Sequence, residues 1–231
     1  MILCYVSYPI NPKMKILNLS RHFSTTVLRN KSIRIGCASG FWGDTPTAVP
    51  QLLNGGKLDY LMFDYLSEVT MSLMTASKAK NPDLGYAPDF VLFAIGPHLK
   101  QIKEQNVKII ANAGGINTLA CVEALKQASK KAGVDLKIAS VTGDDMMPMR
   151  KQLMSGDPIS VQEMSTGQVL PKTVHSMTAY FGAGPIAEAF KLGADIVVTG
   201  RTADRYCSTY THCSKSSFFV QKFNFDFPKK L

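Results

Sequence analysis

The stretch VKIIANAGGINTLACVEALKQASKKAGVDLKIASV, residues 107–141, decides the expected fold. It begins with a short apolar, β-prone run that ends at the pair Gly114-Gly115. A helical pattern starts at Asn117, carries its apolar residues on one face and stops at a glycine. A second apolar run follows over residues 136–141. This order predicts a strand, a crossover helix and a parallel strand.

The same order of elements occurs on both sides of this stretch. On the N-terminal side, a β-prone run over 33–37 precedes a helix that starts after Thr45-Pro46, and a strand over 58–63 follows. On the C-terminal side, a helix from Gly184-Pro185 to Leu192 precedes a strand over 196–199. Between these units we expect a helix over 66–79, a connection over 81–88 and a helix over 90–104 that breaks at Pro97. The predicted class is α/β, a mostly parallel, Rossmann-like sheet between two helical layers.

Composition and charge exclude several classes of protein. The chain has 231 residues, of which 45% are hydrophobic and 19% charged, which is typical of a globular domain. The net charge of +9 resides at the two ends, because residues 35–204 carry a net charge of −1. A nucleic-acid partner is therefore not expected. No apolar run is long enough to span a membrane. The five cysteines suggest no disulfide framework, and Cys207, His212 and Cys213 are too few to favour a metal site.

The N-terminal segment has the composition of a mitochondrial presequence. Residues 1–34 carry six Lys or Arg and no acid, and the apolar residues between Met14 and Arg29 recur at helical spacing. The string from Arg21 to Thr26 resembles a matrix-protease cleavage context. We therefore expect a targeting segment over 1–32 and a location in the mitochondrial matrix. A disordered basic tail is the alternative interpretation.

Small, polar and charged residues follow each predicted strand, where ligands bind in open parallel sheets. The sequence predicts that they share one rim around a small-molecule substrate. The expected ligand-binding residues are Gly40, Trp42, Asp44, Glu68, Asn112, Gly114, Gly115, Thr142 and Gly143. The expected catalytic residues are Asp144, Asp145 and Arg201. We expect no metal ligands, and neither a dinucleotide fingerprint nor a phosphate loop occurs, so the sequence names no cofactor.

Each of these assignments has a structural alternative. The pair Gly114-Gly115 could form a tight turn alone rather than an anion site at a helix N-terminus. One of the two adjacent aspartates, Asp144 or Asp145, could cap a helix over 146–153 while the other meets the ligand. Arg201 could clamp a carboxylate, phosphate or coenzyme A group, or it could form a salt bridge with Asp204 or Glu68. Trp42 could cover a pocket or only pack.

Six motifs in order resemble the acyclic terpene utilisation protein family. They are Gly40–Asp44, Asp64–Met71, Gly85–Phe90, Asn112–Asn117, Thr142–Asp145 and Gly193–Arg201. The resemblance runs from about Ile33 to Asp204, and it implies a role in the catabolism of citronellol-type terpenes and branched acyl-CoA compounds. It establishes no catalytic residues. Family members continue past Arg201, so we expect an α/β domain over 33–205 that is incomplete at its C-terminal end, followed by an irregular tail over 206–231.

Three functions remain open at this point. The first is a mitochondrial enzyme, or enzyme subunit, acting on a branched acyl-CoA or acyclic isoprenoid compound. The second is a non-catalytic binding partner of the subunits of a biotin-dependent acyl-CoA carboxylase. The third is a nucleotide-binding phosphotransferase, which the missing phosphate loop disfavours.

Overall fold

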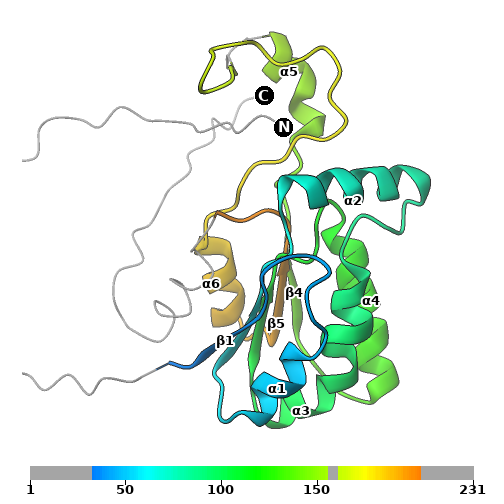
Figure 1. The fold of residues 1–231 in the computed structure, drawn as a ribbon, viewed down its shortest axis with the longest axis vertical. Coiled ribbons are helices and arrows are strands. Elements are labelled where there is room, and N and C mark those ends of the chain that lie inside the picture. Colours follow the sequence, from blue (N-terminus) through cyan, green and yellow to red (C-terminus); the bar gives the residue numbers. More distant parts are fainter. Residues whose placement is uncertain (1–32, 156–160, 204–231) are drawn as a thin grey trace, which may run out of the picture. The chain divides into compact units, whose positions relative to one another are not determined.

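A computed structural model describes residues 33–155 and 161–203 of the chain. The expected presequence, the expected tail and the Cys207–Cys213 cluster lie outside these residues. The described part contains a five-stranded, all-parallel sheet in the order β1-β2-β3-β5-β4 (Figure 1). Its strands are β1 (Ile35–Ser39), β2 (Tyr60–Phe63), β3 (Lys108–Ala111), β4 (Ile138–Val141) and β5 (Ile196–Thr199). The α/β fold class predicted from the sequence is confirmed.

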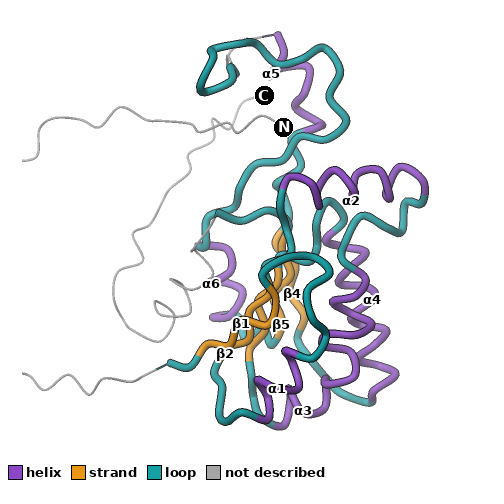
Figure 2. Tube along the Cα trace, viewed as in Figure 1, coloured by secondary structure: helices purple, strands orange, loops and turns teal. Residues whose placement is uncertain are grey.

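Helices cover one face of the sheet densely. They are α1 (Ala48–Asn54), α3 (Leu99–Glu104) and α4 (Thr118–Ala132), which lie on the same side of the strands in Figure 2. Leu53, Ile102 and Leu125 from these helices pack with Leu61 and Ile109 from the strands in one buried cluster. As the helical spacing predicted, Leu53 of α1 and Val122 and Leu125 of α4 are buried. Leu119, which was expected on the same face of α4, is exposed instead.

The opposite face of the sheet packs against α6 (Gly184–Lys191) (Figure 1). Ile186 of α6 is buried with Tyr60, Ile110 and Val197 from the strands. The third layer is therefore present, and all four residues of β5 are buried between the two faces. The connection after β3 runs through α4 on one face of the sheet, and the connection after β4 runs through α6 on the opposite face. The carboxyl ends of β3, β5 and β4 thus form a topological switch point, where open α/β sheets bind ligands.

The helix α4 begins and ends at the residues that its sequence signals. Gly133 follows its last turn with a φ of +66°, and its N–H bonds back to the carbonyl of Lys130. This left-handed conformation is the usual helix ending, and glycine adopts it without strain. Cys121 and Leu125 on the inner face of α4 are fully buried.

The segment expected as one interrupted helix over 90–104 consists of three kinds of helix. A π-helix covers Phe90–Ile95, a 3₁₀ turn covers Gly96–His98, and α3 follows. Pro97 has no N–H to donate and its ring crowds the preceding turn, so a regular α-helix cannot continue through it. The break at Pro97 is confirmed, and the π-helix was not predicted.

The chain between β4 and α6 contains two shorter helical elements. A 3₁₀ turn covers Met147–Met149 and α5 covers Arg150–Ser155, where the sequence predicted a helix over 146–153. Residues 151–173 belong to a compact unit separate from the sheet domain. Within that unit, Gln162 and Val169 form an isolated antiparallel bridge around the turn at Glu163. No helix in the described ranges is long and apolar enough to cross a membrane.

Candidate functional site

A cavity of about 420 Å³ lies at the switch point, within the sheet domain. One wall consists of α2 (Glu68–Lys80) and the first residues of α4. The other wall consists of the loop after β4 and the returning segment 175–178. Of the predicted site residues, this cavity contains Thr142, Gly143, Asp144 and Asp145.

A larger groove of about 720 Å³ runs along β4 and α6. It is lined mostly by aliphatic residues, and one of its two charged side chains, Glu188, pairs with Lys191 at 3.2 Å. The smaller cavity combines carboxylates, an amine and an imidazole with apolar surface. Ligand sites typically combine apolar walls with a few convergent polar groups, so the smaller cavity is the candidate site.

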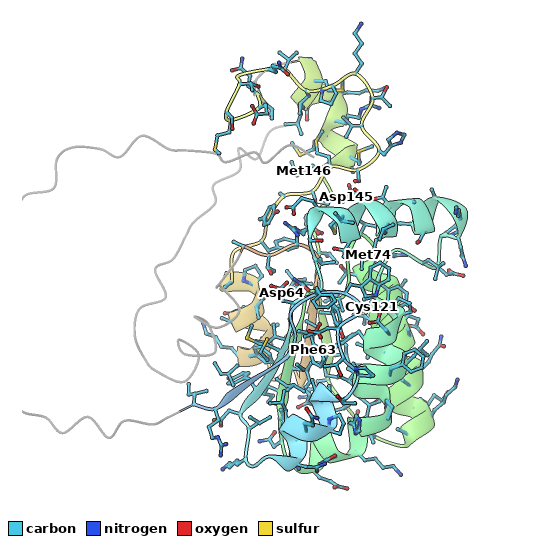
Figure 3. The ribbon with its side chains drawn as sticks, in the orientation of Figure 1. Phe63, Asp64, Met74, Cys121, Asp145 and Met146 are labelled. Atoms are coloured by element: carbon cyan, nitrogen blue, oxygen red, sulfur yellow. The ribbon has the colours of Figure 1, made fainter. Side chains whose placement is uncertain are left out.

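Hydrogen bonds fix the acidic wall of the cavity. The Met146 N–H donates to the Met177 carbonyl and the Ala179 N–H donates to the Asp144 carbonyl, each at 2.8 Å. The Asp145 carboxylate accepts the Met147 N–H at 2.9 Å, which is the capping role that the sequence left open for one of the two aspartates. Asp145 and Met146 lie in this loop in Figure 3.

Asp144 differs sharply from its neighbour, because only 8% of it is exposed. Its Oδ2 is buried and has no hydrogen-bond partner in the described part of the chain. A Cβ at Gly200 would clash with this oxygen, so the glycine is what allows the carboxyl group to lie against the end of β5. Burial raises the pKa of Asp144 above its usual value, more than the backbone N–H groups of Asp144 and Arg201 lower it. Asp144 therefore holds its proton to a higher pH than an exposed aspartate does.

Lys78 lies on the opposite wall of the cavity, and the sequence did not identify it. Its ammonium donates to the Ile116 carbonyl at 2.8 Å. A Cβ at Gly85 would lie 3.0 Å from the Lys78 Cβ and 3.2 Å from its Cδ, so the alkyl stem lies against the Gly85 backbone. Thr75 and Lys78 both line the cavity and are three residues apart on α2. That spacing, which places two residues on one helix face, was the available signal.

The pair Gly114-Gly115 serves close packing in this structure. A Cβ at Gly114 would lie 2.7 Å from the Thr199 carbonyl oxygen, and one at Gly115 would lie 2.6 Å from the Gly85 carbonyl oxygen. Gly115 also has a φ of +53° and contacts Met74, which reaches down from α2 (Figure 3). This packing agrees with the tight-turn alternative. Both glycines lie outside the cavity lining, and their predicted contact with a ligand stays a prediction.

Arg201 is buried in a network of protein groups. Its guanidinium donates to the Leu66 carbonyl, to the Tyr180 hydroxyl and, at 3.0 Å, to the Glu68 carboxylate. It also stacks 4.5 Å from the centre of the Tyr180 ring. The salt bridge to Glu68 that the sequence left open is thus present. Arg201 and Glu68 lie at the same edge of the sheet as the cavity but do not line it.

Asn112 joins two neighbouring strand ends. Its side chain accepts the Tyr65 N–H and donates to the Asp64 carboxylate, both at 2.6 Å. Asn112 is buried and both ends of its amide are in use. It positions the loop after β2, and its predicted contact with a ligand stays a prediction.

The loop after β1 is closed by its own hydrogen bonds. The Asp44 carboxylate accepts the N–H groups of Gly40 at 3.0 Å and Thr45 at 2.7 Å, and these bonds lower the pKa of Asp44. The Trp42 indole donates to the Asp89 carboxylate at 2.5 Å, which ties the loop to the start of the π-helix. Parallel strands place this loop at the same edge as the cavity, two strands beyond β3. Its predicted binding role also stays a prediction.

Residues 33–208 match the family described as acyclic terpene utilisation family protein AtuA. The chain belongs to this family. The matched region includes all five strands and every residue of the candidate cavity, so the cavity is part of the family's domain. Comparison with curated proteins and with solved structures returned no significant match.

Membership of the acyclic terpene utilisation family associates the chain with the use of acyclic terpenes. Membership assigns no reaction and no residue roles. No group of three or more His, Cys, Asp or Glu able to hold a metal ion occurs within residues 33–155 and 161–203.

Proposed function

We propose that the chain binds an acyclic isoprenoid or branched acyl compound in the cavity, and that Asp144 acts there as an acid–base group. One observation carries the proposal: Asp144 lines the cavity and is buried, and its Oδ2, which lies against Gly200, has no hydrogen-bond partner in the described part of the chain. Buried unpaired polar groups reduce stability, and functional sites are where such groups concentrate.

The size and the apolar lining of the cavity support a branched hydrocarbon chain as the ligand. The volume of about 420 Å³ lies within the usual range of small-molecule sites. Ile116, Leu119, Met147 and Met177 supply apolar surface from both walls. The two methionines have flexible thioether side chains that adapt to an irregular, branched chain.

Acid–base chemistry at Asp144 follows from its surroundings. A general acid works best when its pKa approaches the working pH, and burial shifts the pKa of Asp144 in that direction. In its protonated form Asp144 can donate a proton to an oxygen of the bound compound, and as a carboxylate it can take one back. Such acid–base chemistry supports the proposal that the chain is an enzyme, or an enzyme subunit, acting on branched acyl compounds.

Binding measured by isothermal titration calorimetry tests this proposal. The full chain is titrated with citronellyl-CoA and citronellic acid, and Asp144→Asn is compared with the exposed control Asp135→Asn. We expect saturable binding that Asp135→Asn retains and whose pH dependence Asp144→Asn abolishes. If neither compound binds, or if the pH dependence survives in Asp144→Asn, the proposal is wrong.

We also propose that the chain acts in the mitochondrial matrix. The proposal rests on residues 1–34, whose sequence is basic, free of acids and amphipathic in pattern. A fluorescent reporter fused after residue 34 should be imported into mitochondria. The same fusion with the double substitution Arg21→Glu and Arg29→Glu should stay in the cytosol, because the membrane potential, negative inside, draws positively charged segments inward. A reporter that remains cytosolic would exclude this location.

A further inference from the structure

We propose that the cavity selects ligands with an oxyanion head group, a carboxylate or a phosphate, which binds between Lys78 and the first turn of α4. This inference rests on the proposed function, since it concerns the same cavity. Beyond the proposed function, it specifies that the anionic end of the ligand is recognised and that Lys78 recognises it.

Lys78 has the geometry of an anion-binding residue. Its ammonium carries three N–H donors, and the Ile116 carbonyl uses one of them. Lys78 also contributes to the cavity lining, and two of its three donors remain for a ligand. Contact with the Gly85 backbone holds the alkyl stem in place, so little conformational freedom is lost when an anion binds.

The beginning of α4 adds further donors to the same wall. The Asn117 side chain donates to the carbonyls of Pro82 and Leu84, both at 2.7 Å, and does not cap the helix. In the described part of the chain, the backbone N–H groups of Thr118 and Leu119 have no acceptor, and both residues line the cavity. The free N–H groups and the dipole of this 15-residue helix favour negative charge there.

The acidic wall defines the opposite end of the cavity. Asp145 uses one carboxylate oxygen to cap Met147, and Asp144 is nine-tenths buried with one oxygen unpartnered. Burial raises the pKa of Asp144, whereas the nearby Lys78 charge lowers it. The cavity therefore has a donor-rich wall at Lys78 and an acidic wall at Asp144 and Asp145, which orients a ligand with its anionic head toward α4 and away from the two aspartates.

Three probes with one carbon skeleton test the head group, namely geraniol, geranic acid and geranyl phosphate. We expect the full chain to bind an anionic probe at least about tenfold more tightly than geraniol, as charge-assisted hydrogen bonds imply. Whichever of the two anions binds more tightly identifies the source of the oxyanion.

Variants of α2 test the assignment to Lys78. Lys78→Met should weaken binding of the preferred anion about tenfold and change geraniol binding less than about twofold, because the apolar stem is retained. Lys78→Arg should restore anion binding, and the exposed control Lys80→Met should leave all three affinities unchanged.

The outcomes separate this inference from the proposed function. Equal binding of geraniol and both anions, or an equal loss for all probes in Lys78→Met, would overturn the inference and leave isoprenoid binding standing. Binding of none of the three probes would overturn both.

Discussion

A substitution at Gly115 tests whether the Gly114-Gly115 turn requires glycine because it packs closely against Met74 and Gly85. Its φ of +53° costs a residue with a Cβ about 1–2 kcal/mol. The added Cβ would also clash with the Met74 sulfur and lie 2.6 Å from the Gly85 carbonyl oxygen, so α2 or the backbone at Gly85 has to shift. Overpacking of this kind costs about 1–3 kcal/mol. Gly115→Ala should therefore lower the free energy of unfolding by about 2–5 kcal/mol, a large part of the about 5–15 kcal/mol typical of a domain.

Gly133 supplies the matched control for this prediction. Its φ of +66° is similar, but a Cβ there would meet nothing within 4 Å. Gly133→Ala should therefore show the backbone cost alone, about 1–2 kcal/mol. Urea denaturation followed by circular dichroism measures both variants without any ligand. If Gly115→Ala loses no more stability than Gly133→Ala, the close approach of Gly115 to Met74 and Gly85 is not what the turn requires.

Two further substitutions test charges at opposite edges of the sheet. Burial raises the pKa of Asp195, but its hydrogen bonds with Lys108, the Lys137 N–H and Lys103 outweigh this and hold the pKa below its usual value. Asp195→Asn should thus destabilise the protein by about 2 kcal/mol at pH 7 and by less as the pH falls below 4. Urea denaturation of the original protein and the variant at pH 7 and below pH 4 measures this. A loss of stability that is the same at both pH values would contradict the ion pairs. Arg201→Lys should cost about 2–3 kcal/mol of stability, because a compact ammonium lacks the planar, five-donor guanidinium that bonds to Leu66 and Glu68 and stacks on the Tyr180 ring. It should leave ligand affinity unchanged in calorimetry. A loss of affinity at unchanged stability would instead assign Arg201 to the ligand.

The fold was predictable because local signals agreed with the global arrangement. The apolar runs at 107–111 and 196–199 became β3 and β5, and the glycine after α4 ended that helix as expected. Agreement of this kind between propensity, pattern and turn chemistry is what specifies a fold. The π-helix at Phe90–Ile95 was missed, since Pro97 predicts a break but not how the preceding turn adjusts.

The candidate site was predictable only in part, for two physical reasons. The parallel-strand rule places Asp144 and Asn112 at one edge, but it cannot tell which side chains the protein uses internally. Asn112 uses both ends of its amide in bonds to Asp64 and Tyr65, whereas the Asp144 Oδ2 has no partner in the described part of the chain. Lys78 was missed because it follows no strand. It reaches the site only through the folded contact of α2 with the Ile116 carbonyl, which lies 38 residues further along the chain. Strand ends thus predict where a ligand binds in such a sheet, and the helices that cross that edge decide what the ligand is.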